Sequence, residues 1–206
     1  MSRFLIPLAL LLTTGLSSCI SSADRLAQPN APAGPLEVRQ VTDLDARGTD
    51  GHFTFFSLRD GRIVPPEDSA STAWDLALRS TTILVNSGAS GPGAGGIAVL
   101  PDTTLEAVTM APPDAEFATD RGAQRGQTAL PTGAGQGWYD YDMSTGVVEP
   151  KPLVLVVRTA DGRFAKMRIK SYYLGAPAGD DLDPRGGFRY YTFEYVFQPD
   201  GSRHLR

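Results

Sequence analysis

Residues that could hold a metal or attack a substrate are scarce in this chain. Its 206 residues include two histidines, His52 and His204, and one cysteine, Cys19. These three side chains cannot build a typical zinc site, and an acidic cluster at 180–183 lacks the ligand pattern of an EF-hand. There is no G-x-S-x-G motif, and a Ser-His-Asp triad would have to use a histidine without local support. We therefore expect this protein not to be an enzyme.

A glycine-rich segment at 86–96 is the one place where the sequence suggests a nucleotide site. Gly91, Gly93 and Gly96 fit the G-x-G-x-x-G pattern, and the segment follows a run typical of a strand. That pattern binds a pyrophosphate only when a helix begins directly after it. Here the next residues, Ile97–Leu100, are typical of a strand and are followed by proline, and no Gly-Lys-Ser/Thr of a P-loop is present. The segment is therefore predicted to be a long connection between two strands.

The amino-terminal residues have the features of a bacterial lipoprotein signal. Ser2-Arg3 is a short basic region, and 4–12 is an apolar run too short to span a bilayer as a helix. Leu16-Ser17-Ser18-Cys19 resembles a lipobox, which has a branched apolar residue, two small residues and a cysteine. We expect 1–18 to be a signal peptide and Cys19 to carry the lipid. Because Cys19 is the only cysteine, no disulfide can form within one molecule.

The residues after Cys19 indicate a tethered domain. An aspartate directly after the lipidated cysteine would resemble an inner-membrane retention signal, but this position is Ile20. We therefore expect an outer-membrane protein, on the periplasmic face or the cell surface. Several acyl chains on one residue hold a protein at a membrane essentially permanently. Segment 19–35 is rich in Ser, Ala, Pro and Asn and is expected to be a flexible linker. A single folded domain is expected over 36–206.

Composition favours an all-β domain and argues against nucleic acid as a partner. The chain has 19 Lys and Arg against 23 Asp and Glu, a net charge of −4, with no block of either sign. Nucleic-acid binding depends on clustered Lys and Arg. Glycine (22) and proline (16) are abundant, and long stretches with a helical period are absent. These features are typical of a β protein with many turns.

The apolar pattern predicts mostly antiparallel strands. Segment 153–158 (LVLVVR) is continuously apolar, which predicts a strand buried on both faces, and segment 111–137 is predicted to be irregular. The last three strands should form an antiparallel meander against which the others pack. Strands are expected at Leu36–Thr42, His52–Leu58, Arg62–Val64, Trp74–Leu78, Thr81–Val85, Ile97–Leu100, Leu105–Val108, Leu153–Arg158, Phe164–Tyr173 and Phe188–Phe197.

Four segments together resemble the HmuY-like family of haem-binding outer-membrane lipoproteins. The similarity in order and spacing extends over about 38–197, and the lipobox agrees with it. The resemblance implies an all-β fold that holds haem between loops at one end, ligated by two side chains. It also implies a haemophore-like role in which haem passes to a TonB-dependent receptor. The segments are WDLALR at Trp74–Arg79, NSGASGPGAGG at Asn86–Gly96, GWYDYD at Gly137–Asp142 and VVRTADGRFAKMRIKSYY at Val156–Tyr173.

The resemblance also implies ligand positions. The family can place one axial ligand five residues after the tryptophan of the GW motif, and here this position is Met143. A thioether is a soft ligand that suits ferrous iron. The second ligand of histidine-using members lies in the preceding loop, but 117–136 contains neither His nor Met, which leaves Met110 as the nearby candidate. Tyr139 and Tyr141 flank Met143 and could stack on a porphyrin.

Two functions remain open on these grounds. The first is a surface lipoprotein that binds haem and delivers it to an outer-membrane receptor for iron acquisition. The second is an interaction module on the same scaffold that has lost haem coordination and binds another ligand or a protein. The missing second ligand distinguishes them. A purely structural envelope protein is a third, weaker alternative.

Overall fold

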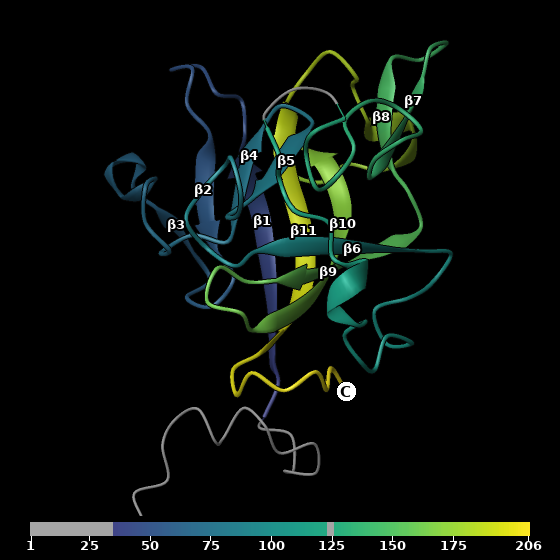
Figure 1. The fold of residues 1–206 in the computed structure, drawn as a ribbon. Helices are drawn as coiled ribbons and strands as arrows, with labels where there is room; N and C mark the ends of the chain where they lie inside the picture. Colours follow the sequence, from purple (N-terminus) through teal and green to yellow (C-terminus); the bar gives the residue numbers. More distant parts are fainter. Residues whose placement is uncertain (1–34, 123–125) are drawn as a thin grey trace, which may run out of the picture. The chain divides into compact units, whose positions relative to one another are not determined.

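The computed structural model describes residues 35–122 and 126–206 and is nearly all β, as expected (Figure 1). The expected signal peptide, Cys19 and the linker up to residue 34 lie outside the described residues. Within the described part of the chain, no helix is long and apolar enough to span a bilayer. The strands are β1 (Glu37–Asp45), β2 (Thr54–Ser57), β3 (Arg62–Val64), β4 (Leu76–Arg79), β5 (Thr82–Val85), β6 (Gly96–Pro101), β7 (Tyr139–Asp142), β8 (Val147–Pro150), β9 (Leu153–Arg158), β10 (Phe164–Tyr173) and β11 (Phe188–Gln198). The described residues also form three short 3-10 helices: η2 (Pro66–Asp68), η3 (Asp114–Glu116) and η4 (Gly179–Asp181).

Five antiparallel strands form the larger sheet, in the order β1-β11-β10-β9-β6. β9, β10 and β11 are consecutive neighbours, which confirms the meander that the sequence predicts. β9 lies between β10 and β6, and its first five residues are buried. Its continuous apolar run is therefore explained by cover on both faces of the sheet.

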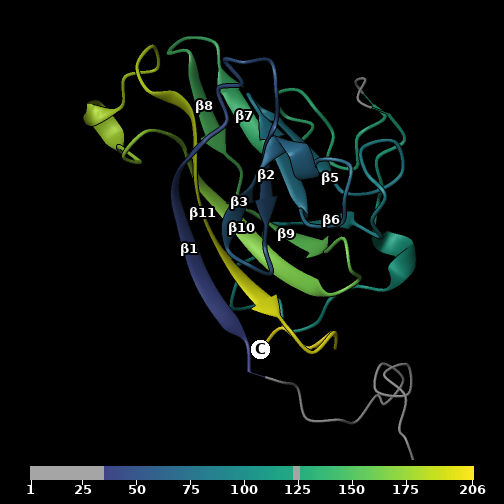
Figure 2. The ribbon, with the colours of Figure 1, turned by 90° about the vertical axis from the view of Figure 1, so that its left-hand side faces the viewer.

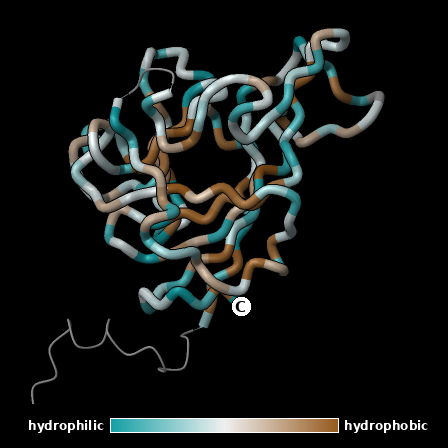
Figure 3. The backbone as a smooth tube through the Cα atoms, turned by 45° about the vertical axis from the view of Figure 1, so that its right-hand side comes forward, coloured by the Kyte–Doolittle hydropathy of each residue, from teal (hydrophilic) through white to brown (hydrophobic). Residues whose placement is uncertain are grey.

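A four-stranded sheet in the order β3-β2-β4-β5 packs against one face of the larger sheet. The core between them includes Phe56 of β2, Leu78 of β4 and Phe193 of β11, all buried. The Phe56 and Phe193 rings meet edge to face, with centroids 5.5 Å apart. Hydrophobic stretches gather along these central strands, whereas hydrophilic stretches lie mostly in the loops (Figure 3). β10 and β11 each contribute alternate apolar residues to this core: Ala165, Met167, Ile169, Tyr191, Phe193, Tyr195 and Phe197.

The opposite face of the larger sheet is covered by irregular chain instead of a further strand. The predicted strand at Leu105–Val108 is wrong, because this segment forms a turn. The reason is Lys166 of β10, whose Nζ donates hydrogen bonds to the carbonyls of Leu105 (2.6 Å) and Val108 (2.9 Å). These carbonyls therefore point at a buried ammonium group and not at a neighbouring strand. Burial lowers the pKa of Lys166.

The glycine-rich segment joins β5 to β6 and folds around the buried side chain of Asn86. Its Nδ2 donates to the carbonyls of Ser71 and Trp74, each at 2.8 Å, and its Oδ1 accepts from the Gly93 amide at 2.8 Å. A Cβ added at Gly91 would lie 2.2 Å from Oδ1 of Asn86, so only glycine fits there. β6 follows directly, as predicted, and no helix begins there to bind a phosphate.

Three connections gather at one end of the domain, the upper end in Figures 1 and 2. They are the β1–β2 connection, the β7–β8 turn and the β10–β11 connection, which contains η4. The carboxyl terminus lies at the opposite end of β11 (Figure 2). Since loops carry much of the function of β proteins, this end is the candidate site.

Candidate functional site

Met143 is placed at the tip of the β7–β8 turn, with 89% of its surface exposed. Asp142 organises this turn: its Oδ1 accepts hydrogen bonds from the amide (2.8 Å) and the hydroxyl (2.7 Å) of Ser144. These hydrogen bonds, with others from Thr145, lower the pKa of Asp142 to about 2. The Gly146 amide closes the turn on the Asp142 carbonyl at 2.7 Å, with a positive φ of 78°. Met143 therefore does not fill a gap in the core, and a carboxylate that is charged at neutral pH precedes its thioether.

The base of the hairpin is held firmly by buried aromatic residues. Nε1 of Trp138 donates to the carbonyl of Thr81 at 2.9 Å, and the indole is buried. At the other strand, the Val148 amide donates to the hydroxyl of Tyr173 at 2.9 Å. The GW motif thus fixes the start of β7 on the body of the domain, and the position five residues later is carried out into solvent.

The two tyrosines beside Met143 have different environments. Tyr139 is only 8% exposed, and its ring packs on Trp138 with centroids 4.9 Å apart. It is part of the core and presents no open face to a ligand. Tyr141 is 48% exposed and lies on the hairpin near the turn. Of the two, only Tyr141 can stack on a ligand bound at Met143.

Met110 is not brought close to Met143. It forms an isolated β-bridge with His204, next to a hydrogen bond from the Leu205 amide to the Thr109 carbonyl (2.8 Å). This pairing places Met110 at the carboxyl-terminal end of β11, whereas the β7–β8 hairpin packs beside the other end (Figures 1 and 2). The 11 residues of β11 correspond to roughly 30 Å. The two thioethers cannot ligate one iron in this arrangement.

No replacement for the second ligand occurs where the sequence comparison would place it. Residues 117–122 and 126–136, the described part of the preceding loop, contain neither His nor Met. His52 lies in the β1–β2 connection, at the same end as Met143, and is exposed. The sequence pattern predicts that a strand begins at His52, but β2 begins two residues later, at Thr54. In the described parts of the chain, no three His, Cys, Asp or Glu side chains are grouped to hold a metal ion.

Exposed apolar side chains gather at this end. The described chain has eight large hydrophobic side chains that are exposed, and four of them lie on or beside the β7–β8 and β10–β11 connections. The two connections touch, since a Cβ at Gly146 would lie 3.8 Å from Cβ of Pro184. A concentration of exposed apolar groups marks a binding surface more often than chance placement does. The four are Tyr141, Met143, Leu174 and Phe188.

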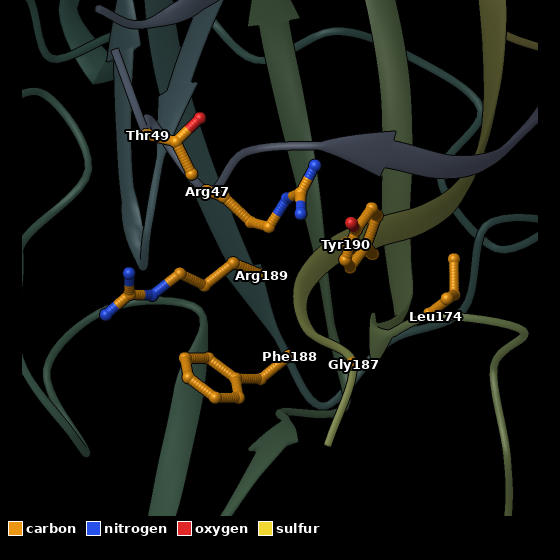
Figure 4. A pocket seen from close by; sticks show the side chains of 7 residues that line it. All are labelled: Arg47, Thr49, Leu174, Gly187, Phe188, Arg189 and Tyr190. Carbon is orange, nitrogen blue, oxygen red and sulfur yellow. The ribbon is translucent and has the colours of Figure 1, made fainter. Parts of the chain in front are cut away.

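A shallow hollow of about 290 Å³ opens at the same end, where the β1–β2 connection meets the start of β11 (Figure 4). Two arginines, Arg47 and Arg189, stand over the aromatic rings of Tyr190 and Phe188 respectively. The sequence gives no signal for this hollow, because its residues come from three separate segments and no motif contains them. The lining residues are Arg47, Thr49, Leu174, Gly187, Phe188, Arg189 and Tyr190.

Comparison with known proteins agrees with the fold and the motif positions. The HmuY protein family matches residues 50–195, which include the four-stranded sheet, the β7–β8 hairpin and most of β11. No curated protein sequence matches the chain significantly. The fold is similar to that of an apo HmuY analogue from Tannerella forsythia, at 16% identity and a TM-score of 0.57, covering 82% of this chain and 100% of the other.

Two further solved structures share the fold with lower TM-scores. A candidate HmuY-like haem-binding protein from Bacteroides vulgatus is 15% identical with a TM-score of 0.51, covering 79% of this chain and 92% of that one. A candidate lipoprotein from Bacteroides fragilis is 17% identical with a TM-score of 0.51, covering 79% and 89%. These likenesses concern the fold. Because the family match extends over most of the sequence, the chain belongs to the HmuY family.

Proposed function

We propose that this protein binds haem at the end that carries the β7–β8 turn, with the thioether of Met143 as an axial ligand of the iron. The observation that carries the proposal is the position of Met143: five residues after the buried Trp138, on an ordered turn, with its sulfur free in solvent. Family membership supports it, and the related Bacteroides vulgatus protein is described as haem-binding.

The residues present fit haem on one side. A porphyrin needs apolar or aromatic contacts on its faces and a ligand for its iron. Tyr141 supplies an exposed ring on the same hairpin as Met143. Of the other methionines in the described residues, Met110 is paired with His204 at the other end of β11 and Met167 is buried in the core, so neither is a second ligand. We therefore propose a site in which Met143 is the one axial ligand that this chain supplies, and in which ferrous haem binds more tightly than ferric haem.

We propose further that the protein is lipid-anchored through Cys19 at the outer membrane and passes its haem to a TonB-dependent receptor. The lipobox and the linker to residue 35 support the anchor. An exposed ligand position suits transfer, because a receptor could approach the haem without first unfolding the domain.

Haem titration of the full chain carrying Cys19→Ser tests the central proposal. We expect a saturable shift of the Soret band at one haem per chain, with a larger shift and tighter binding when dithionite keeps the iron ferrous. Absence of a saturable shift in both redox states would contradict haem binding. That result would favour the second candidate function, a binding module for another ligand, for which the lack of His and Met in 117–122 and 126–136 is the supporting observation.

The anchor has a separate test. In cells that express the full chain, Cys19→Ser should move the protein from the membrane fraction to the soluble fraction, because the thiol that accepts the first acyl chain is gone. Fractionation followed by detection of the chain measures this. Ser18→Ala, which keeps the small residue before the cysteine, is the matched control and should remain in the membrane. Unchanged membrane association of Cys19→Ser would remove the lipoprotein assignment.

A further inference from the structure

We infer that the hollow between the β1–β2 connection and the start of β11 is a second binding site, for a small aromatic carboxylate. The proposed iron ligand on the β7–β8 turn is not among its lining residues, and the inference does not depend on haem binding. Figure 4 shows the hollow with its arginine and aromatic side chains.

A bulge in β11 builds the hollow. Between the pairs Ser171–Thr192 and Tyr173–Phe188, β10 advances by two residues and β11 by four. In a regular strand, successive side chains point to opposite faces of the sheet. Here three consecutive residues, 188–190, line one hollow. Bulges of this kind redirect side chains and are frequent next to binding sites.

The backbone at Arg189 is held in an unfavourable conformation. Its φ is 72°, in the left-handed region that residues with a Cβ rarely adopt. The Ala46 amide donates to the Arg189 carbonyl at 2.8 Å and helps to fix this geometry. Such strain persists only where the surrounding structure imposes it, and it is concentrated at binding sites.

The charges of the hollow leave one guanidinium for an anion. Arg47 is paired with Asp45, with Nη2 and Oδ2 2.6 Å apart. Arg189 forms no ion pair with any carboxylate in the described chain. Its guanidinium lies 4.9 Å from the centre of the Phe188 ring and also interacts with the hydroxyl of Tyr172. A guanidinium carries five N–H donors, so one hydroxyl partner leaves others for a carboxylate, which a guanidinium can bind through two parallel hydrogen bonds.

The shape and lining define the remainder of the ligand. Leu174 is 52% exposed and Phe188 39% exposed, so both offer apolar surface to a flat ring. Gly187, which is exposed and has a φ of 63°, lies against Leu174 and adds no side chain to the hollow. The volume of about 290 Å³ is at the small end of ligand pockets, which span ~300–1,000 Å³. The occupant is therefore a mono- or bicyclic aromatic acid and not a complete tetrapyrrole.

Titration of indole-3-acetate into the full chain carrying Cys19→Ser tests this site. Binding is measured from the shifts of the amide NMR signals of Gly187 and Tyr190. We expect saturation with a Kd below about 1 mM, and binding at least tenfold weaker for indole, which has the same ring without the carboxylate. Arg189→Gly removes the guanidinium but tolerates the positive φ, so it should fold and raise the Kd at least tenfold. Arg62→Gln removes an exposed charge from β3 and should leave the Kd unchanged.

Three results would overturn the inference. They are equal affinity for indole and indole-3-acetate, an unchanged Kd in Arg189→Gly, and no saturable shift of these signals at millimolar ligand. Met143→Leu should retain indole-3-acetate binding. A protein that binds indole-3-acetate but not haem would retain this site while losing the proposed function, and the reverse result would remove only this site.

Discussion

Asn86→Ala is expected to lower the free energy of unfolding by about 4 kcal/mol. The substitution removes three hydrogen bonds, each at 2.8 Å, and leaves the carbonyls of Ser71 and Trp74 and the amide of Gly93 without this partner. An unsatisfied buried backbone group costs roughly 1–3 kcal/mol. Asn86 is fully buried, so water cannot readily replace the lost contacts. Equilibrium unfolding in urea, monitored by tryptophan fluorescence, measures the loss directly.

Gln40→Ala on the exposed face of β1 is the matched control, and it should change the free energy by no more than about 0.5 kcal/mol. A second variant, Gly91→Ala, should destabilise for a complementary reason, because its Cβ would lie 2.2 Å from Oδ1 of Asn86. If Asn86→Ala unfolded at the same urea concentration as the parent, the segment would not depend on this side chain.

The glycine-rich segment shows how far the sequence leads. Its position between two strands is predictable, because runs of β-branched residues flank it and a proline ends the second run. The reason for its glycines is not predictable. It depends on a single asparagine that joins Gly93 of this segment to Ser71 and Trp74 in the preceding connection, and no local pattern carries such information.

The site shows the same division. A turn at Met143 is predictable from the residues around it, and the structure adds that the side chain is exposed. The sequence suggests Met110 as a partner of Met143 only because Met110 lies next to the irregular loop along the chain. In the structure, Met110 pairs with His204 beyond the carboxyl-terminal end of β11, whereas the β7–β8 hairpin packs beside the other end of that strand. The hollow at Arg189 arises from a bulge in β11 and from the positive φ of Arg189. Neither feature is predictable from the sequence, because a positive φ is expected at glycine and not at arginine.

Met143→Leu is expected to weaken binding of ferrous haem at least tenfold, equivalent to about 1.4 kcal/mol or more. Leucine keeps a similar apolar volume but lacks the sulfur, so the change isolates iron ligation from contact with the porphyrin. Because Met143 is 89% exposed, the variant should unfold at the same urea concentration as the parent chain. The measurement is the dithionite-reduced haem titration in the Cys19→Ser background, read at the Soret band.

Met110→Leu makes the same chemical change at the other end of β11 and should leave haem affinity as it is in the parent. Met143→His provides the complementary variant: imidazole also ligates haem iron and is a less soft ligand, so binding should return and shift toward the ferric state. Equal weakening by Met110→Leu and Met143→Leu would point to a nonspecific effect. Unchanged ferrous affinity in Met143→Leu would show that the turn does not supply the ligand, and His52, the histidine in the β1–β2 connection at the same end, would be the next side chain to replace.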